Sequence, residues 1–287
     1  MIHISFDALS YKALGPEEAL QSELADIAES FGIDLVKLDL SGQFKELLRK
    51  LHAKVGRVVL LIDEYDKLII DYLETSALDT AKTNRGVLRE FYSILKSADE
   101  QLRLVFITGI SKFAKVSLFS HLNNLDDITL NEQFAALAGY TQDEIKTNFG
   151  EYLDSVQAKF SISRDELVGK MKFWYNGFSW DGVTRIYNPF GTLSFFRNRE
   201  FRNYWFSTGS PEFLIEQMKK HGQFALENTP VNSVTFDKFD IEDIELVSLL
   251  FQTGYLTIKD RDVLPRLLRA GLSQPGSARE YIPVFVG

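Results

Sequence analysis

The first half of the chain alternates short apolar runs with longer segments in which apolar residues recur at helical spacing. The runs are about five residues long, and the helical segments and loops between them are long enough to carry a crossover connection. This alternation predicts an α/β fold with a parallel sheet. The predicted strands are 2–6, 58–62 and 102–109, and the predicted helices are 16–31, one that begins after Ser41, and 83–98.

The pattern changes beyond Tyr140, where helical spacing dominates. Residues 128–130 can form one further short strand before this change, and residues 241–251 read as an acidic helix followed by a strand-like GYLTIKD. We therefore predict an α/β core over 1–140, a mainly helical, winged-helix-like extension over 141–260, and an atypical tail over 261–287. The helices predicted in the extension are 141–160, 163–175, 189–197 and 211–221.

Composition narrows the class of protein. With 287 residues and 45% hydrophobic content, the chain can bury a substantial core. No window of about 18 apolar residues predicts a membrane span, and the first residues carry no basic leader or small-residue cleavage site. The chain has no cysteine, which excludes disulfides and thiolate metal sites and fits a cytoplasmic location. A formal charge of −8 argues against a nucleic-acid-binding surface.

The most informative segment is RVVLLIDEYD, residues 57–66. Five branched apolar residues end in Asp63 and Glu64, which predicts a strand buried on both faces with two acids at its carboxyl end. Ligands of parallel sheets collect at that edge. The segment has the form of a Walker B motif, in which Asp63 would hold Mg²⁺ through water and Glu64 would orient or deprotonate an attacking water. The alternative is that either acid only caps a helix over 65–73.

A second strand end carries weaker signals. Thr108 follows LVFI directly, at the position where a residue that senses the γ-phosphate would lie, although threonine is common at strand ends. Lys112 and Lys115 could neutralise phosphate charge, but solvated lysines are the simpler interpretation. The four histidines are scattered and form no pair with metal-ligand spacing.

The sequence does not contain G-x-x-x-x-G-K-[ST], the glycine-rich loop whose amides hold nucleotide phosphates. Gly-Lys occurs only at Gly169–Lys170, far beyond the acidic strand. In nucleotide-binding folds of this kind the phosphate loop precedes that strand. We therefore expect these residues to be a fragment of a longer fold.

Several segments together resemble the AAA-ATPase-like family, which comprises bacterial proteins of the STAND type within the P-loop (ASCE) class. They are LIDEYDKLI, RGVLREFYSILKSADEQLRLVFITGISKFAKVSLFSHLNNLDDITL, AGYTQDEI, FWYNGFSW, YNPFGTL and FRNYWFSTGSPEFLI. The resemblance runs from Ile2 to about Asp260. It implies that Asp63 and Glu64 are the Walker B acids and that Thr108 and Ser111 lie on the sensor-like strand end. It also implies Mg²⁺ and ATP as ligands and, in relatives, a PD-(D/E)XK nuclease-like domain fused at the C-terminus.

The family fold has strand order 5-1-4-3-2, and this chain begins at its second strand. The resemblance thus implies a sheet without the Walker A strand, with an unpaired apolar edge at Leu104–Ile107. Both ends look truncated, as a shortened or frame-shifted reading frame would explain. We expect an ATP-dependent regulatory module whose hydrolysis is impaired in this chain. The alternatives are a non-enzymatic protein-interaction module, or a nuclease, for which Asp237, Lys238 and Asp260 supply no convincing acid and E-x-K set.

Overall fold

The computed structural model describes residues 1–73, 75–110, 118–119, 122, 124–204, 229–232, 246–261 and 267–272. The chain divides into two compact units. Unit 1 comprises Met1–Asp126 with Asp237–Ile244, and unit 2 comprises Asp127–Phe236 with Glu245–Gly287. The three domains expected from the sequence, 1–140, 141–260 and 261–287, stay a prediction. Among the helices that the structure describes, none is long and apolar enough to cross a membrane.

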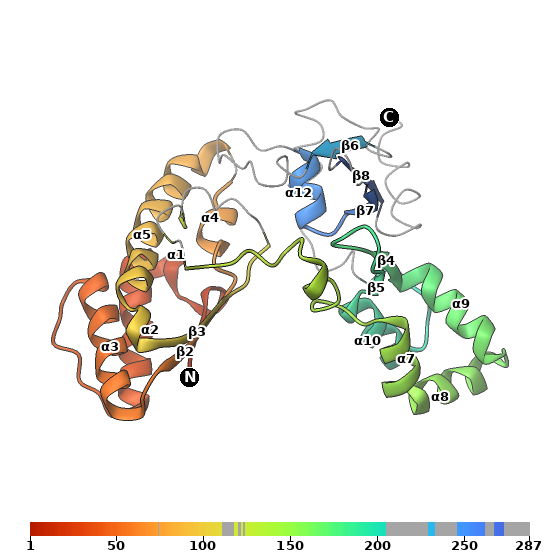
Figure 1. Ribbon diagram of the computed structural model, residues 1–287, viewed down its shortest axis with the longest axis horizontal. Coiled ribbons are helices and arrows are strands. Elements are labelled where there is room, and N and C mark those ends of the chain that lie inside the picture. The colour runs from red at the N-terminus through yellow and green to blue at the C-terminus, as the bar shows by residue number, and fades with distance from the viewer. Residues whose placement is uncertain are drawn as a thin grey trace. The chain divides into compact units, whose positions relative to one another are not determined.

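Unit 1 is built on a three-stranded parallel sheet in the order β1-β2-β3, with helices packed on one side (Figure 1). Ile4 of β1 aligns with Ile62 of β2, which aligns with Ile107 of β3, so equivalent side chains share a face. The elements are β1 (Ile2–Ser5), η1 (Phe6–Ala8), α1 (Tyr11–Leu14), α2 (Pro16–Ser30), α3 (Leu40–Val55), β2 (Val58–Asp63), α4 (Lys67–Ile70), η2 (Thr75–Ala77), α5 (Leu78–Ser97), η3 (Asp99–Gln101) and β3 (Leu102–Ile107).

The two faces of this sheet differ, and here the expectation of a strand buried on both faces is wrong. Leu60 and Ile62 are buried on the face of β2 that packs against α3, whereas Leu61 is only half-buried. On the same face as Leu61, Leu104 is 51% exposed and Phe106 is 37% exposed. The reason is that the described helices cover one face, and an apolar run alone does not say how many faces are covered.

Within the described residues β3 lies at the edge of its sheet, as the strand order of the family implies for an apolar edge at Leu104–Ile107. The prediction of a further strand at residues 128–130 is wrong. That segment is a turn, because the Asp127 carboxylate accepts hydrogen bonds from the Thr129 amide and hydroxyl at 3.0 and 2.6 Å. A side chain that binds its own backbone in this way competes with strand pairing.

Unit 2 combines helices with two small antiparallel sheets, β4-β5 and β6-β8-β7. Its aromatic core includes Tyr175 of FWYNGF and Tyr187 of YNPF, whereas Phe173 and Phe190 of the same segments are exposed. The helix expected over 141–160 is interrupted at Phe149, and the one expected over 211–221 lies outside the described residues. The elements are η4 (Glu132–Phe134), α7 (Gln142–Asn148), α8 (Gly150–Phe160), α9 (Arg164–Tyr175), β4 (Asn176–Phe178), β5 (Ile186–Tyr187), α10 (Pro189–Asn198), β6 (Thr229–Asn232), α12 (Leu246–Gln252), β7 (Leu256–Arg261) and β8 (Leu267–Leu272).

Candidate functional site at the carboxyl ends of the strands

The carboxyl ends of β2 and β3 bring two of the predicted residues into contact. Thr108 donates from Oγ1 to Oδ1 of Asp63 at 2.5 Å. The backbone fixes this pair, because the Thr108 amide donates to the Ile62 carbonyl at 2.8 Å and the Thr108 carbonyl accepts from the Tyr65 amide at 3.0 Å. Asp63 is exposed, so the carboxylate and the hydroxyl face solvent together at the ligand-binding edge of the sheet.

Glu64 lies one residue beyond the strand in an unusual backbone conformation. Its φ of 53° is in the left-handed region, which only a small share of non-glycine residues adopt. Burial raises the pKa of Glu64, and the nearby Asp7 raises it further, while Lys67 acts in the opposite direction. Neither Asp63 nor Glu64 caps α4, whose N-cap residue is Asp66 and makes no side-chain capping bond. The helix-capping alternative is therefore wrong.

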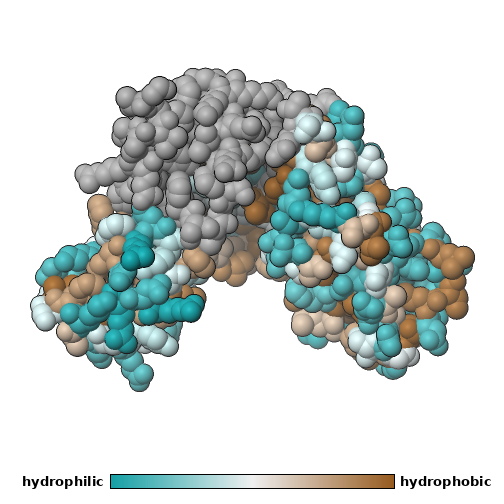
Figure 2. Space-filling model, turned by 180° about the vertical axis from the view of Figure 1, so that it is seen from behind, coloured by the Kyte–Doolittle hydropathy of each residue, from teal (hydrophilic) through white to brown (hydrophobic). Residues whose placement is uncertain are grey.

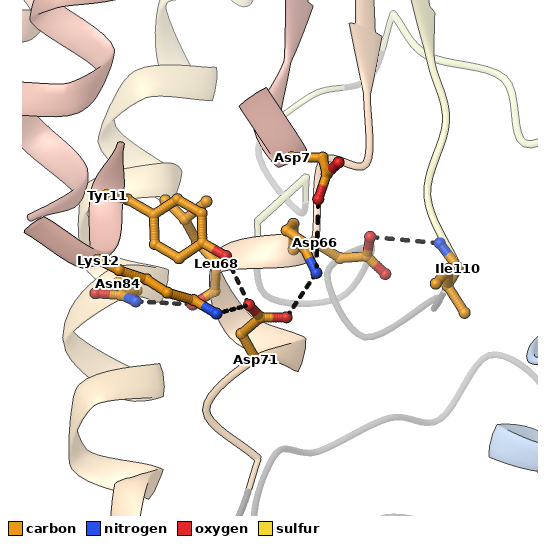
Figure 3. A network of polar contacts seen from close by, with 9 residues as sticks. Asp7, Tyr11, Lys12, Asp66, Leu68, Asp71, Asn84 and Ile110 are labelled. Carbon is orange, nitrogen blue, oxygen red and sulfur yellow. Dashed lines mark hydrogen bonds and ion pairs between the residues drawn. The ribbon is translucent and has the colours of Figure 1, made fainter. Parts of the chain in front are cut away.

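The carboxylate of Asp71, the residue that follows α4, accepts from three donors (Figure 3). Asp71 accepts from the Tyr11 hydroxyl at 2.7 Å, from Lys12 Nζ at 2.8 Å and from Lys67 Nζ at 2.9 Å. Burial raises the pKa of Asp71, but these donors outweigh it and hold the pKa below its usual value. Lys67 Nζ also lies 3.8 Å from Asp7 Oδ1, so one ammonium group links η1 to the residue that follows α4.

The turn after β2 is fitted tightly against the end of β3. Asp66 is 1% exposed, and its Oδ1 accepts from the Ile110 amide at 3.3 Å. A Cβ atom on Gly109 would lie 2.4 Å from the ring of Tyr65 and 2.6 Å from Asp66 Oδ1. Only glycine fits between these two side chains without displacing them. The backbone around Thr108 is thus held in one place.

The geometry around Asp63 fits a Mg²⁺ ion that takes one ligand from the protein and the rest from water and phosphate. In the part of the chain that the structure describes, no group of three or more His, Cys, Asp and Glu side chains could hold a metal ion. Magnesium in nucleotide sites is commonly held by one or two carboxylates together with waters and substrate phosphates. Asp63 meets that requirement, because its contacts with Thr108 and with the Glu64 amide both involve Oδ1, and its side chain is exposed.

The sequence located some of these residues and missed others. Asp63, Glu64 and Thr108 lie together at the strand ends, while Ser111, Lys112 and Lys115 lie outside the described residues. Sequence reasoning missed Asp7 and Lys67, whose charges act on Glu64, and the hydrogen-bond partners Tyr11 and Asp71. The available signal was Asp7, two residues after the end of β1, because a third parallel strand places its carboxyl end at the same edge. The missed residues are Asp7, Tyr11, Lys67 and Asp71.

Comparison with known proteins finds one matching family model and one similar curated protein. Residues 1–119 match the model of a family described as "Predicted AAA-ATPase". The matched region includes the whole sheet of unit 1 and both acids.

A curated protein from Azotobacter chroococcum mcd 1, described as "Uncharacterized protein in vnfD 5'region", is 40% identical over 262 residues. The alignment covers 90% of this chain and 48% of that protein, so the chain spans about half the length of the curated relative it matches. No solved structure matches the chain.

Proposed function

We propose that unit 1 binds a Mg²⁺–ATP complex at the carboxyl ends of its strands and supports hydrolysis of the γ-phosphate. The observation that carries the proposal is the contact between Asp63 and Thr108, made from two strand ends within the region that matches the Predicted AAA-ATPase family. A metal ion bound there would neutralise phosphate charge and polarise the bond that breaks.

Each residue has a separate role in this proposal. Asp63 holds the metal ion through a water molecule, with its Oδ1 oriented by the Thr108 hydroxyl. Glu64 orients the attacking water and accepts its proton, a role that the raised pKa of this carboxyl favours. In this proposal Thr108 also senses the γ-phosphate. We extend the sensing role to Ser111 on the basis of the sequence resemblance alone.

Phosphate anchoring is the weak part of the site. Because the printed sequence holds no G-x-x-x-x-G-K-[ST], these residues supply no P-loop cradle for the β- and γ-phosphates. We therefore propose that the 287-residue chain binds ATP weakly and hydrolyses it slowly. We also propose that nucleotide state acts on the helical part of a STAND-type regulatory module in the cytoplasm. A nuclease-like domain in cis remains part of this proposal for longer relatives.

The test is metal and nucleotide binding by the purified chain. Mn²⁺ replaces Mg²⁺ and is followed by electron paramagnetic resonance, with and without ATP at millimolar concentration. We expect ATP-dependent Mn²⁺ binding that Asp63→Asn loses and Glu64→Gln retains. Any phosphate release should fall about 100-fold or more in Glu64→Gln.

Glu100→Gln is the matched control, because Glu100 is an exposed acid in η3 at the opposite end of β3. It should behave like the wild type. Equal Mn²⁺–ATP binding by Asp63→Asn and the wild type would contradict the proposed site. Rapid turnover by the unmodified chain would contradict the proposed weak anchoring.

A further inference from the structure

The segment that joins α2 to α3, residues 31–39, forms an extended strap along both helices. Its end lies beside the start of α2, where Gln21 Nε2 donates to the Leu38 carbonyl at 2.8 Å. Its beginning lies beside the end of α3, where Lys54 Nζ donates to the Phe31 carbonyl at 2.6 Å. The strap therefore runs antiparallel to α2 and α3, which lie parallel to each other.

The strap is firmly held, yet it presents apolar side chains to solvent. Glu46 of α3 accepts from the Val36 and Lys37 amides at 2.9 and 3.0 Å, and Lys50 donates to the Asp34 carbonyl at 2.6 Å. Even so, Val36 is 70% exposed and Leu38 is 88% exposed. The strap is seen as brown surface at the right-hand edge of Figure 2. A fixed backbone lowers the entropy that an apolar contact would cost on binding.

Opposite charges flank the strap. Helix α2 contains acidic residues and neither lysine nor arginine, whereas the exposed charged side chains of α3 are all basic. The one acid of α3, Glu46, is buried against the strap and paired with Lys50 at 2.8 Å. The exposed acids of α2 are Glu17, Glu18, Asp26 and Glu29, and the exposed bases of α3 are Lys45, Arg49 and Lys54.

This order of acidic helix, apolar strap and basic helix is complementary to itself. A two-fold axis running along the strap, in the plane of the contact, would lay the acidic helix of one copy against the basic helix of the other. The same axis would bring the two straps together in the centre. Such a contact is isologous and closed, and it buries Val36 and Leu38 from both copies.

We propose that two copies of this chain associate through the α2–strap–α3 surface. The axis keeps side chains at the same height along the strap. Lys50 and Lys54 of α3 bond to Asp34 and Phe31, which follow closely on the end of α2. Arg49 of each copy therefore lies opposite Glu29 of the other. This proposal does not depend on nucleotide binding.

Sedimentation velocity of the purified 287-residue chain over a range of concentrations tests the proposal. We expect a dimer at low ionic strength that weakens as salt screens the flanking charges. Leu38→Asp and Arg49→Glu should each shift the chain to monomer. The double variant Arg49→Glu/Glu29→Arg should restore the dimer, because the charges are exchanged and the contact stays complementary. Circular dichroism should show unchanged folding, since all three side chains are exposed.

Phe106→Asp is the control for a second exposed apolar surface of unit 1, the open face of β3. It should leave the dimer intact. A wild-type chain that stays monomeric at low salt would overturn the proposal. Loss of the dimer in Phe106→Asp but not in Leu38→Asp would overturn it in favour of the sheet face. A monomer that binds vesicles rich in anionic lipid, and loses that binding in Arg49→Glu, would assign the surface to a membrane instead.

Discussion

Two glutamates of unit 1 occupy opposite kinds of environment. Glu46 accepts hydrogen bonds from Lys50 and from two strap amides, and these donors lower its pKa to about 2. Glu64 is partly buried among acids, with a raised pKa and a left-handed backbone. The hydrogen bonds of the Glu46 carboxylate are thus satisfied, and this residue holds the strap in place. Glu64, which we propose to react, instead carries backbone strain and charge repulsion. Such conflicts concentrate at functional positions.

Of the substitutions considered, those in the tightly packed backbone around the strand ends should destabilise the chain most. Gly109→Ala places a methyl group against Tyr65, whose side chain is buried, and against Asp66. We expect a loss of about 1–3 kcal/mol in the free energy of unfolding, as for overpacking in a core. Urea denaturation measures it. Gly150→Ala is the matched control, because nothing lies within 4 Å of its Cβ position. Equal losses in both variants would show that the fit around Gly109 is loose.

Removing the Glu46 carboxylate should lower the stability of the chain by less than Gly109→Ala does. Glu46→Ala leaves the Val36 and Lys37 amides without their acceptor, but the strap is near the surface, so water can replace part of what is lost. We expect a lower melting temperature together with faster hydrogen exchange at these two amides. Asp34→Ala, which removes an exposed acid from the same strap, should change neither. Unchanged exchange in Glu46→Ala would mean that Glu46 does not hold the strap.

The same carboxylate should make stability depend on pH in the acid range. The pKa of Glu46 is about 2 in the folded chain and has a usual value of 4.5. Its contribution is therefore present above pH 4.5 and disappears as the pH falls toward 2. The difference in unfolding free energy between the wild type and Glu46→Gln should shrink over that interval. A difference that stays constant would contradict the lowered pKa.

Sequence patterns anticipated the parts of this molecule that depend on neighbouring residues. The β2 strand and its two terminal acids follow from an unbroken apolar run, and α2 follows from Pro16 with acids in the first turn. Sequence patterns failed where the structure depends on contacts between segments that are far apart in the sequence. They could not show that one sheet face is left open, that Asp71 collects donors from α1 and α4, or that Asp127 turns residues 128–130 away from a strand. Those outcomes depend on which side chains meet after folding.

Of the two glutamates, Glu64, which we propose to react, should be the one whose removal costs the fold least. Glu64→Gln removes a charge that burial and Asp7 disfavour, while it keeps a side chain of the same shape. We expect an unfolding free energy equal to or slightly above that of the wild type at neutral pH, measured by urea denaturation. Glu46→Gln should instead lower the unfolding free energy under the same conditions. If Glu64→Gln destabilised the chain as much as Glu46→Gln, Glu64 would be a structural residue and the contrast between the two acids would fail.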